Sequence, residues 1–456
     1  MTALSLALLI PWAAGGVLAL ADGRRGVVGW LAVGALLANL VAVIVLATQM
    51  AGGEPVVVTT GEWAPGIGIT LRADGLGIVF AIVSSFALLA ACAHEVLEGV
   101  RERSFPALVV LLAAGLTGLF LTGDLFNFYV FFELAMTASY LLATYGGERR
   151  ELGGALIFMI VNLLGTFLFL LSVAGAYHVT GTLEMAQLAE RMATVQPSAA
   201  ILIAVGFFVA FCVKLGLFPF HFWLPTVYTA SRPAVAAILG GAVANIGVYG
   251  LLRFGGELFE RELEFADVAL IAIGALSILY GGLVAVSRRS AAEMLAYSAI
   301  GQVGYVLVAL GIGGPVGFAA AVLYGVVNSL NKTLLFLTTS MRGALVGGAF
   351  AVGALSVVGL PPAAGFVGKL EIFRSAAGEP LLLALFVLGS ALSFVYAFQL
   401  YQIDFWRDER TGPIAVPAQQ ALIALLALVV LAAGLWPEAL LAPAHEAAAA
   451  LVEEGP

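Results

Sequence analysis

The lysines are the most unusual of the few charged side chains in this sequence. The chain has 456 residues and seventeen arginines but only three lysines, Lys214, Lys332 and Lys369, and each lies inside an apolar stretch. Arginine stays protonated in proteins, whereas a buried lysine can lose its proton. A residue that must alternate between a charged and a neutral form therefore has to be lysine. These three are the candidate proton-carrying groups, with snorkelling or a structural ion pair as the alternatives.

Glu133 is the acidic counterpart of the lysines. If Asp124 caps the helix that begins there, Glu133 lies about 14 Å deeper, near the middle of a hydrocarbon core about 30 Å thick. Its sequence neighbours are apolar, so we expect a lysine from another helix to be its partner. Protonating one member of such a pair changes the proton affinity of the other. The pair is therefore a candidate switch, and a purely structural pair is the alternative.

The remaining polar residues give weaker signals. We expect Asp124 and Asn127 to start a helix, and His221 either to pass protons or to be an interior histidine with satisfied hydrogen bonds. His94 and His445 are expected to be interfacial or exposed. His178 lies at a helix end and indicates no site. Glu371 and Arg374 are expected to form a local pair.

The sequence has no sign of a bound cofactor or metal. Cys92 and Cys212 both lie in apolar segments and form neither a disulfide framework nor a metal cluster. Zinc-protease, CxxC, haem and quinone patterns are absent, and residues 365–369 lack the spacing of a phosphate loop. We therefore expect no cofactor, no metal site and no enzymatic centre of the chain's own.

The composition defines the elements that must position these residues. Hydrophobic residues make up 62% of the chain and charged residues 11%, with a mean hydropathy of +1.07, whereas a soluble domain carries about 25% charged residues. The net charge of −8 comes without a basic stripe, so no nucleic acid partner is expected. The sequence predicts an all-α polytopic protein of the lipid bilayer.

Fourteen membrane spans are predicted, and the arginines orient them. With the N-terminus outside, twelve of the seventeen arginines fall in inner loops and five on the outer side, which is the positive-inside pattern. Both termini are then outside, in the periplasm of a bacterial inner membrane. The predicted spans are 3–20, 27–50, 74–96, 106–122, 125–145, 152–178, 199–230, 233–253, 266–287, 295–311, 314–339, 344–374, 380–403 and 419–437.

Two of these spans are broken by proline and lie five spans apart. One break is predicted at Phe218-Pro219-Phe220, followed by Pro225, and the other at Gly359-Leu360-Pro361-Pro362, because proline removes a helical hydrogen bond. Matched discontinuous helices point to inverted repeats around a transport site. The predicted units are helices 1–3 in residues 1–104, a first inverted five-helix repeat in 105–255, a second in 256–404, and an amphipathic connector with the last helix in 405–456.

Three connecting segments have a predicted form. Residues 51–73 suggest a small outer hairpin with strands near 56–60 and 67–70. Residues 179–197 suggest a short surface helix, and residues 404–418 an inner amphipathic connector.

Four motifs resemble one family. Residues 122–143 (TGDLFNFYVFFELAMTASYLLA), 213–225 (VKLGLFPFHFWLP), 296–305 (AYSAIGQVGY) and 359–369 (GLPPAAGFVGK) are similar to the antiporter-like subunits of Mrp-type Na⁺/H⁺ antiporters, NADH dehydrogenase and membrane-bound hydrogenases. The first motif is most similar to the D-type subunits of Mrp complexes. The likeness runs from about residue 105 to 405 and implies a fourteen-helix fold with inverted five-helix repeats.

The resemblance also implies roles for the site residues. Glu133 and Lys214 would form the coupling pair of the first half-channel, Lys332 the central relay and Lys369 the terminal residue. Relatives usually have a lysine where Asn245 stands, and many have a histidine where Asn328 stands. Asparagine does not titrate, so the relay between Lys214 and Lys332 would need bound water or would be weakened.

Three functions are compatible with the sequence. The first is a proton-translocating subunit of a multisubunit Na⁺/H⁺ antiporter, with other membrane subunits as partners. The second is a proton-pumping subunit of a redox-driven complex, a NADH dehydrogenase or a hydrogenase. The third is a scaffold subunit that has lost transport. The coupled cation, the stoichiometry and the direction of flux are left open by the sequence.

Overall fold

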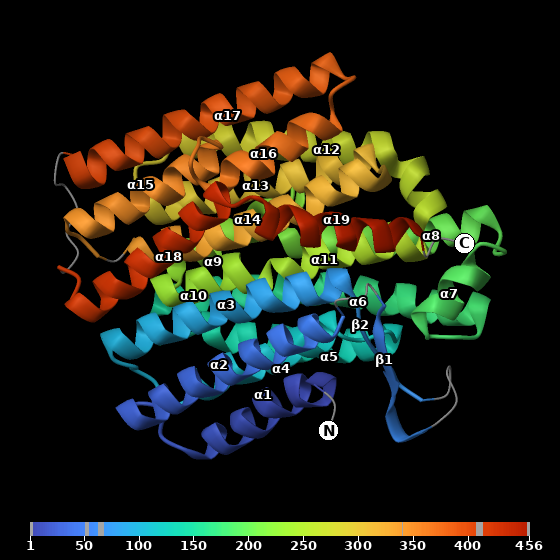
Figure 1. Cartoon of the computed structure of the whole chain (residues 1–456), viewed down its shortest axis with the longest axis horizontal. Coiled ribbons are helices and arrows are strands. Elements are labelled where there is room, and N and C mark those ends of the chain that lie inside the picture. Colours follow the sequence, from blue (N-terminus) through green and yellow to red (C-terminus); the bar gives the residue numbers. More distant parts are fainter. Residues whose placement is uncertain (1–2, 51–53, 63–67, 340, 407–413, 454–456) are drawn as a thin grey trace.

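The computed structural model describes residues 3–50, 54–62, 68–339, 341–406 and 414–453, in which helices run side by side in one bundle (Figure 1). Among these residues, twelve helical segments are long and apolar enough to cross a membrane, and two apolar helices, Phe105–Phe120 and Ala344–Val358, are shorter. The predicted all-α polytopic fold is confirmed. The count of fourteen spans stays a prediction. It would be reached if the two shorter helices also cross the membrane.

The N-terminal part is a row of helices with one hairpin. Aspartates begin two of its helices, because Asp74 accepts from the Gly77 N–H at 2.9 Å and Asp124 from the Asn127 N–H at 2.7 Å. The predicted helix start at Asp124 is therefore confirmed. The elements are α1 (Ala3–Leu20), α2 (Gly26–Gln49), β1 (Val56–Thr59), η1 (Thr60–Glu62), β2 (Thr70–Ala73), α3 (Gly75–Glu98), α4 (Phe105–Phe120), α5 (Leu125–Ala143) and α6 (Arg149–Thr180).

The predicted hairpin and surface helix are both present. Strand β1 pairs with β2 in antiparallel register, with Val56 opposite Ala73. The second strand begins at Thr70, where the predicted one ends, because the chain stays extended up to the Asp74 cap of α3. Residues 63–67 lie outside the described residues. The surface helix is α7 (Met185–Met192).

The middle of the chain contains short segments separated by non-α turns. Two π-helical turns, η3 and η4, flank α11, and such turns occur often at functional sites. The elements are α8 (Pro197–Leu215), η2 (Phe220–Phe222), α9 (Trp223–Ala230), α10 (Pro233–Ile238), η3 (Leu239–Val243), α11 (Asn245–Arg253), η4 (Phe254–Leu258) and α12 (Glu260–Val286).

The C-terminal part contains the most deeply buried helix, α14. All of its most apolar stretch is buried, and it packs against α3, α10, α13, α15, α16 and α19. The elements are α13 (Ala291–Ile312), α14 (Gly314–Thr338), α15 (Ala344–Val358), α16 (Ala364–Ser375), α17 (Pro380–Tyr401), η5 (Gln402–Trp406), α18 (Pro417–Leu435) and α19 (Glu438–Glu453). Helix α19 was not predicted, and residues 407–413 of the predicted connector lie outside the described residues.

Both predicted breaks exist, and a glycine ends the helix before each of them. Gly216 ends α8 and Gly359 ends α15, both with positive φ, 64° and 88°. At each end the glycine N–H bonds the carbonyl three residues back, and the next N–H bonds the carbonyl five residues back. This is the Schellman motif. Pro219 and Pro361 follow the glycines and prevent either helix from resuming at once.

The two ends of the described chain lie on one side of the bundle. In Figure 1 the label C, the β1–β2 hairpin and α7 stand at the right, and the label N stands below the bundle beside the right-hand end of α1. An even number of crossings would produce this arrangement.

Candidate functional site

Glu133 and Lys214 interact electrostatically between α5 and α8. Lys214 is 4% exposed, and its Nζ lies 5.3 Å from the ring centroid of Phe132 and 5.6 Å from that of Phe158. Among the described residues no hydrogen bond reaches this Nζ, and no ion pair within 4.0 Å joins it to Glu133. Aromatic faces attract a cation without fixing it in place. The ammonium is therefore held loosely within reach of the carboxylate.

Asn245 connects three helices next to the π-helical turn η3. Its Nδ2 donates to Ser84 Oγ at 2.9 Å, to the Gly241 carbonyl at 3.0 Å and to Ser329 Oγ at 3.3 Å. Ser329 lies one turn before Lys332 on α14. A β-carbon at Gly241 would lie 2.1 Å from Thr333 Oγ1, so glycine permits this close approach of η3 to α14. The asparagine is thus bonded to the helix that carries the central lysine.

Lys332 is fully buried and begins a chain of hydrogen bonds. Its Nζ donates to Ser298 Oγ at 2.9 Å and to the Leu295 carbonyl at 3.3 Å. Ser298 Oγ lies 2.8 Å from the Tyr396 hydroxyl, which also lies 3.3 Å from Ser393 Oγ. Hydroxyl groups both donate and accept, so each can receive a proton on one side and release one on the other.

Gln302 strengthens the middle of this chain. Its Nε2 donates to Ser393 Oγ and to the Tyr396 hydroxyl, both at 3.2 Å, and its Oε1 accepts from the Tyr324 hydroxyl. Residues from α13, α14 and α17 thereby form one buried group of side chains. We name Ser298, Gln302, Tyr324, Ser393 and Tyr396 the polar cluster.

Lys369 lies at the far side of this cluster. Its Nζ donates to Ser390 Oγ and to the Val358 carbonyl, both at 3.0 Å, and lies 5.0 Å from the ring centroid of Tyr305. Val358 ends α15, where carbonyl groups lack helical partners and the helix dipole favours a cation. Ser390 precedes Ser393 of the polar cluster by one turn of α17. A cavity of about 560 Å³ borders Lys369 and Ser390.

The polar cluster was not predicted, although the sequence contains a signal for it. Ser298 and Gln302 are four residues apart in the family-like motif of residues 296–305. Ser390, Ser393 and Tyr396 recur every three residues in an otherwise apolar helix. Spacings of three and four put side chains on one helix face.

The other predicted relay residues are placed differently. Asn328 is buried on α14, and its Oδ1 has no hydrogen-bond partner among the described residues. The ring of His221 contacts those of Phe218 and Tyr280, with centroids 5.5 Å and 4.3 Å away. Neither of these ring contacts is with one of the three lysines, so a relay role for His221 stays a prediction.

His94 was expected to be interfacial or exposed, and its exposure is the part that was wrong. Its side chain is fully buried near the end of α3. The tertiary cover over the last turn of α3 overrides the polarity of the local sequence. His445 is exposed as expected, and the Glu371–Arg374 pair is confirmed at 2.6 Å.

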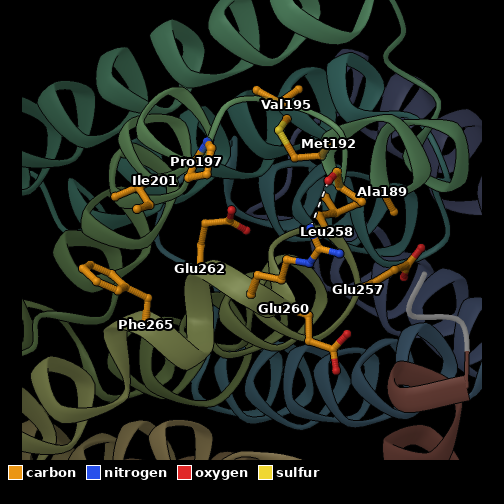
Figure 2. A pocket seen from close by; sticks show the side chains of 12 residues that line it. Ala189, Met192, Val195, Pro197, Ile201, Glu257, Leu258, Glu260, Glu262 and Phe265 are labelled. Atoms are coloured by element: carbon orange, nitrogen blue, oxygen red, sulfur yellow. Dashed lines mark hydrogen bonds between the residues drawn. The ribbon is translucent and has the colours of Figure 1, made fainter.

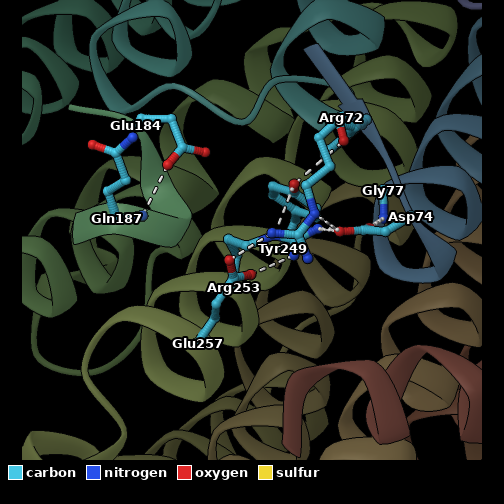
Figure 3. A network of polar contacts seen from close by, with 9 residues as sticks. Arg72, Asp74, Gly77, Glu184, Gln187, Tyr249, Arg253 and Glu257 are labelled. Carbon is cyan, nitrogen blue, oxygen red and sulfur yellow. Dashed lines mark hydrogen bonds and ion pairs between the residues drawn. The ribbon is translucent and has the colours of Figure 1, made fainter. Parts of the chain in front are cut away.

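A buried ion network ties together the end of the bundle that carries the hairpin (Figure 3). Arg253 pairs with Asp74 and Glu257, both at 2.6 Å, and Arg72 pairs with the same acids at 3.1 Å and 2.7 Å. Burial raises the pKa of the Asp74 carboxyl, but Arg253 and Arg72 lower it by more, so that it stays below its ordinary value. The network joins β2, α3, α11 and η4.

An acidic cavity adjoins this network. Figure 2 shows side chains of α7, α8, η4 and α12 around it, and its volume is about 240 Å³. Glu257 of the network, Glu260 and Glu262 are among the lining residues, and Arg261 donates to the Ala193 carbonyl at 3.0 Å. The cavity lies at the end of α8 opposite to Lys214, so it is not part of the lysine chain.

Comparison with known proteins assigns this architecture. Residues 122–393 match the family model described as NADH:quinone oxidoreductase/Mrp antiporter, TM. The chain is 32% identical to the D-type Na(+)/H(+) antiporter subunit of Alkalihalophilus pseudofirmus, covering 89% of this chain and 87% of the relative. It is 31% identical to the protein of the same name in Bacillus subtilis, covering 77% and 76%.

Solved structures of other proteins share the fold of this chain. A chain of the Mrp complex from Dietzia sp. superimposes with a TM-score of 0.91 at 27% identity, covering 99% of this chain and 97% of that one. A chain of respiratory complex I from Thermus thermophilus gives 0.87 at 25% identity, covering 99% and 100%. Both neighbours are parts of multisubunit membrane complexes. The bundle with its two broken helices and buried lysines belongs to the NADH:quinone oxidoreductase/Mrp antiporter transmembrane family.

Proposed function

We propose that the chain is the proton-translocating, antiporter-like subunit of a multisubunit Na⁺/H⁺ antiporter in a bacterial plasma membrane. The names of its relatives support this proposal. The observation that carries it is the hydrogen-bonded polar cluster between the buried lysines Lys332 and Lys369. Three buried lysines are costly in a membrane and mark ion pathways.

The proposed path runs from Glu133 and Lys214 through Asn245 to Lys332 and Lys369. A proton that binds Glu133 removes the negative charge beside Lys214, and this favours proton release from Lys214. Because Asn245 has no titratable proton, water must carry the proton past it. The polar cluster leads from Lys332 to Ser393, which lies one turn of α17 from Ser390, the partner of Lys369. Na⁺ movement is coupled through the partner subunits.

The first test measures Na⁺-dependent proton flux in membrane vesicles that contain the assembled complex. Glu133→Ala or Lys214→Ala should abolish the flux at normal expression. The matched control is Glu190→Ala, which removes an exposed carboxylate on α7. Unchanged flux in both site variants would contradict the proposal.

The likeness to a chain of respiratory complex I supports a second candidate, a proton-pumping subunit of a redox-driven complex. The same path would serve there, and only the partners differ. Purification of the complex in a mild detergent distinguishes the two. Iron–sulfur subunits that copurify with the chain would favour the redox-driven complex, and their absence together with Na⁺-dependent flux would favour the antiporter.

A further inference from the structure

The predicted inner end of α3 carries a group of potential metal ligands away from the lysine chain. One ligand atom each from His94, Glu95 and Glu98 lies within 4.8 Å of the other two. His94 and Glu98 are four residues apart, and Glu95 and Glu98 are three apart, the two spacings that bring side chains together on a helix. Two carboxylates and one imidazole therefore converge on one point.

The imidazole has no other partner. His94 is 0% exposed, and among the described residues neither Nδ1 nor Nε2 has a hydrogen bond. Leaving a buried polar group unsatisfied costs about 1–3 kcal/mol, so nearly all such groups in proteins are bonded. A ligand that binds one ring nitrogen removes this cost. Because two carboxylates lie beside the ring, a cation is the ligand that fits.

The surroundings support the two carboxylates as ligands. Tyr145 donates its hydroxyl to Glu95 Oε1 at 2.6 Å and accepts from the Arg101 N–H at 2.9 Å. Hydrogen bonds of this kind orient metal-binding carboxylates. Glu98 pairs with the exposed guanidinium of Arg101 at 3.3 Å. Because exposed ion pairs are weak, a divalent cation can displace that guanidinium.

From this geometry we propose a binding site for a divalent transition-metal ion of the Zn²⁺ class at His94, Glu95 and Glu98. A neutral imidazole and two carboxylates neutralise a charge of 2+, and a mixed nitrogen–oxygen set favours such an ion over Mg²⁺. Ligand atoms around tetrahedral Zn²⁺ are about 3.4 Å apart. The exposed Glu98 side chain can close the remaining gap. Through Tyr145 the ion would tie α3 to the end of α5, the helix of Glu133.

The test uses the full chain in detergent, purified with a tag that lacks histidine and stripped with a chelator. Titration with Co²⁺, followed by its visible absorption and by displacement with Zn²⁺, should show one saturable site per chain. His94→Gln and Glu98→Gln should both abolish it. Glu98 is at the surface, so its replacement leaves the fold intact. Tyr145→Phe should weaken Co²⁺ binding by about 10- to 100-fold, and Arg101→Gln should tighten it.

His445→Gln is the matched control, because His445 is an exposed histidine that also lies near a glutamate, 3.8 Å from Glu371. It should leave the Co²⁺ titration unchanged. No saturable binding to the native chain, or binding that survives both His94→Gln and Glu98→Gln, would overturn the proposal. The result does not depend on ion flux, so it stands apart from the proposed function.

Discussion

At the scale of single residues, the two halves of the bundle hold their lysines differently. Lys214 rests between aromatic rings without a hydrogen bond among the described residues, whereas Lys332 and Lys369 each donate two. Fixed donors and acceptors suit transfer along hydroxyl groups, and a loosely held ammonium suits movement toward and away from Glu133. We therefore expect the first half to switch and the second half to conduct.

Tyr396→Phe tests the conducting half. The change removes the hydroxyl that lies between Ser298 and Ser393 but keeps the ring, so packing is preserved. We expect Na⁺-dependent proton flux to fall at least about tenfold, in line with the loss of a positioned proton-transfer group. Tyr177→Phe, at an exposed tyrosine of α6, should leave flux unchanged. Equal flux in the two variants would remove the polar cluster from the path.

Asn245→Leu tests whether the uncharged Asn245 is part of the proposed path between Lys214 and Lys332. Leucine has a similar size but cannot bind water or the hydroxyls of Ser84 and Ser329. Flux should be lost while the complex still assembles, as judged by native gel electrophoresis. A subunit that serves only as a scaffold would instead show the same flux with asparagine or leucine at this position.

At the scale of elements, glycine-terminated breaks position the lysines. Lys214 lies in the last turn of α8, and Lys369 donates to the open end of α15. The sequence marks these breaks clearly because glycine and proline are local signals. It does not reveal the polar cluster in the same way, since Ser298, Tyr324 and Tyr396 meet only through the packing of α13, α14 and α17.

Gly359→Ala tests the second break. Gly359 has a φ of 88°, and a β-carbon there would lie 2.5 Å from Lys369 Cδ. The variant should lose about 1–2 kcal/mol of stability from backbone strain, and its flux should fall because Lys369 is displaced. Gly378→Ala is the control, since nothing lies within 4 Å of its β-carbon position. Thermal unfolding in detergent and vesicle flux check both effects, and matching results for the two variants would contradict them.

Arg253→Gln tests the buried ion network. It leaves Asp74 and Glu257 with Arg72 alone, and removing one partner of a buried ion pair costs about 3–5 kcal/mol. We expect a clearly lower unfolding temperature in detergent. The exposed Arg24 also pairs with an aspartate, Asp22, and Arg24→Gln should change little. Similar unfolding temperatures for the two variants would show that the network is not structural.

At the scale of the whole molecule, composition and periodicity predicted the membrane fold, the hairpin and the surface helix. The burial of His94 could not be read from the sequence, because it depends on elements that cover the end of α3. Helix α19 was missed as well, since Pro443 and several alanines and glutamates dilute its apolar character. Arginine asymmetry orients the bundle, and we propose that the hairpin end faces outward.

Cysteine labelling in intact cells tests this orientation. Both native cysteines are buried, so background labelling by an impermeant maleimide should be low. Arg191→Cys on α7 should react from outside, and Arg103→Cys before α4 should react only after lysis. The reverse pattern would invert the topology.

The central claim is that the buried lysines act by alternating between protonated and neutral forms. Lys332→Arg tests this most directly, because arginine keeps the positive charge but does not release its proton. Na⁺-dependent proton flux is measured in vesicles that contain the variant complex, with assembly checked in the same preparation. The account predicts that the complex assembles and that flux is lost. Flux at the native level in the assembled Lys332→Arg complex would contradict it.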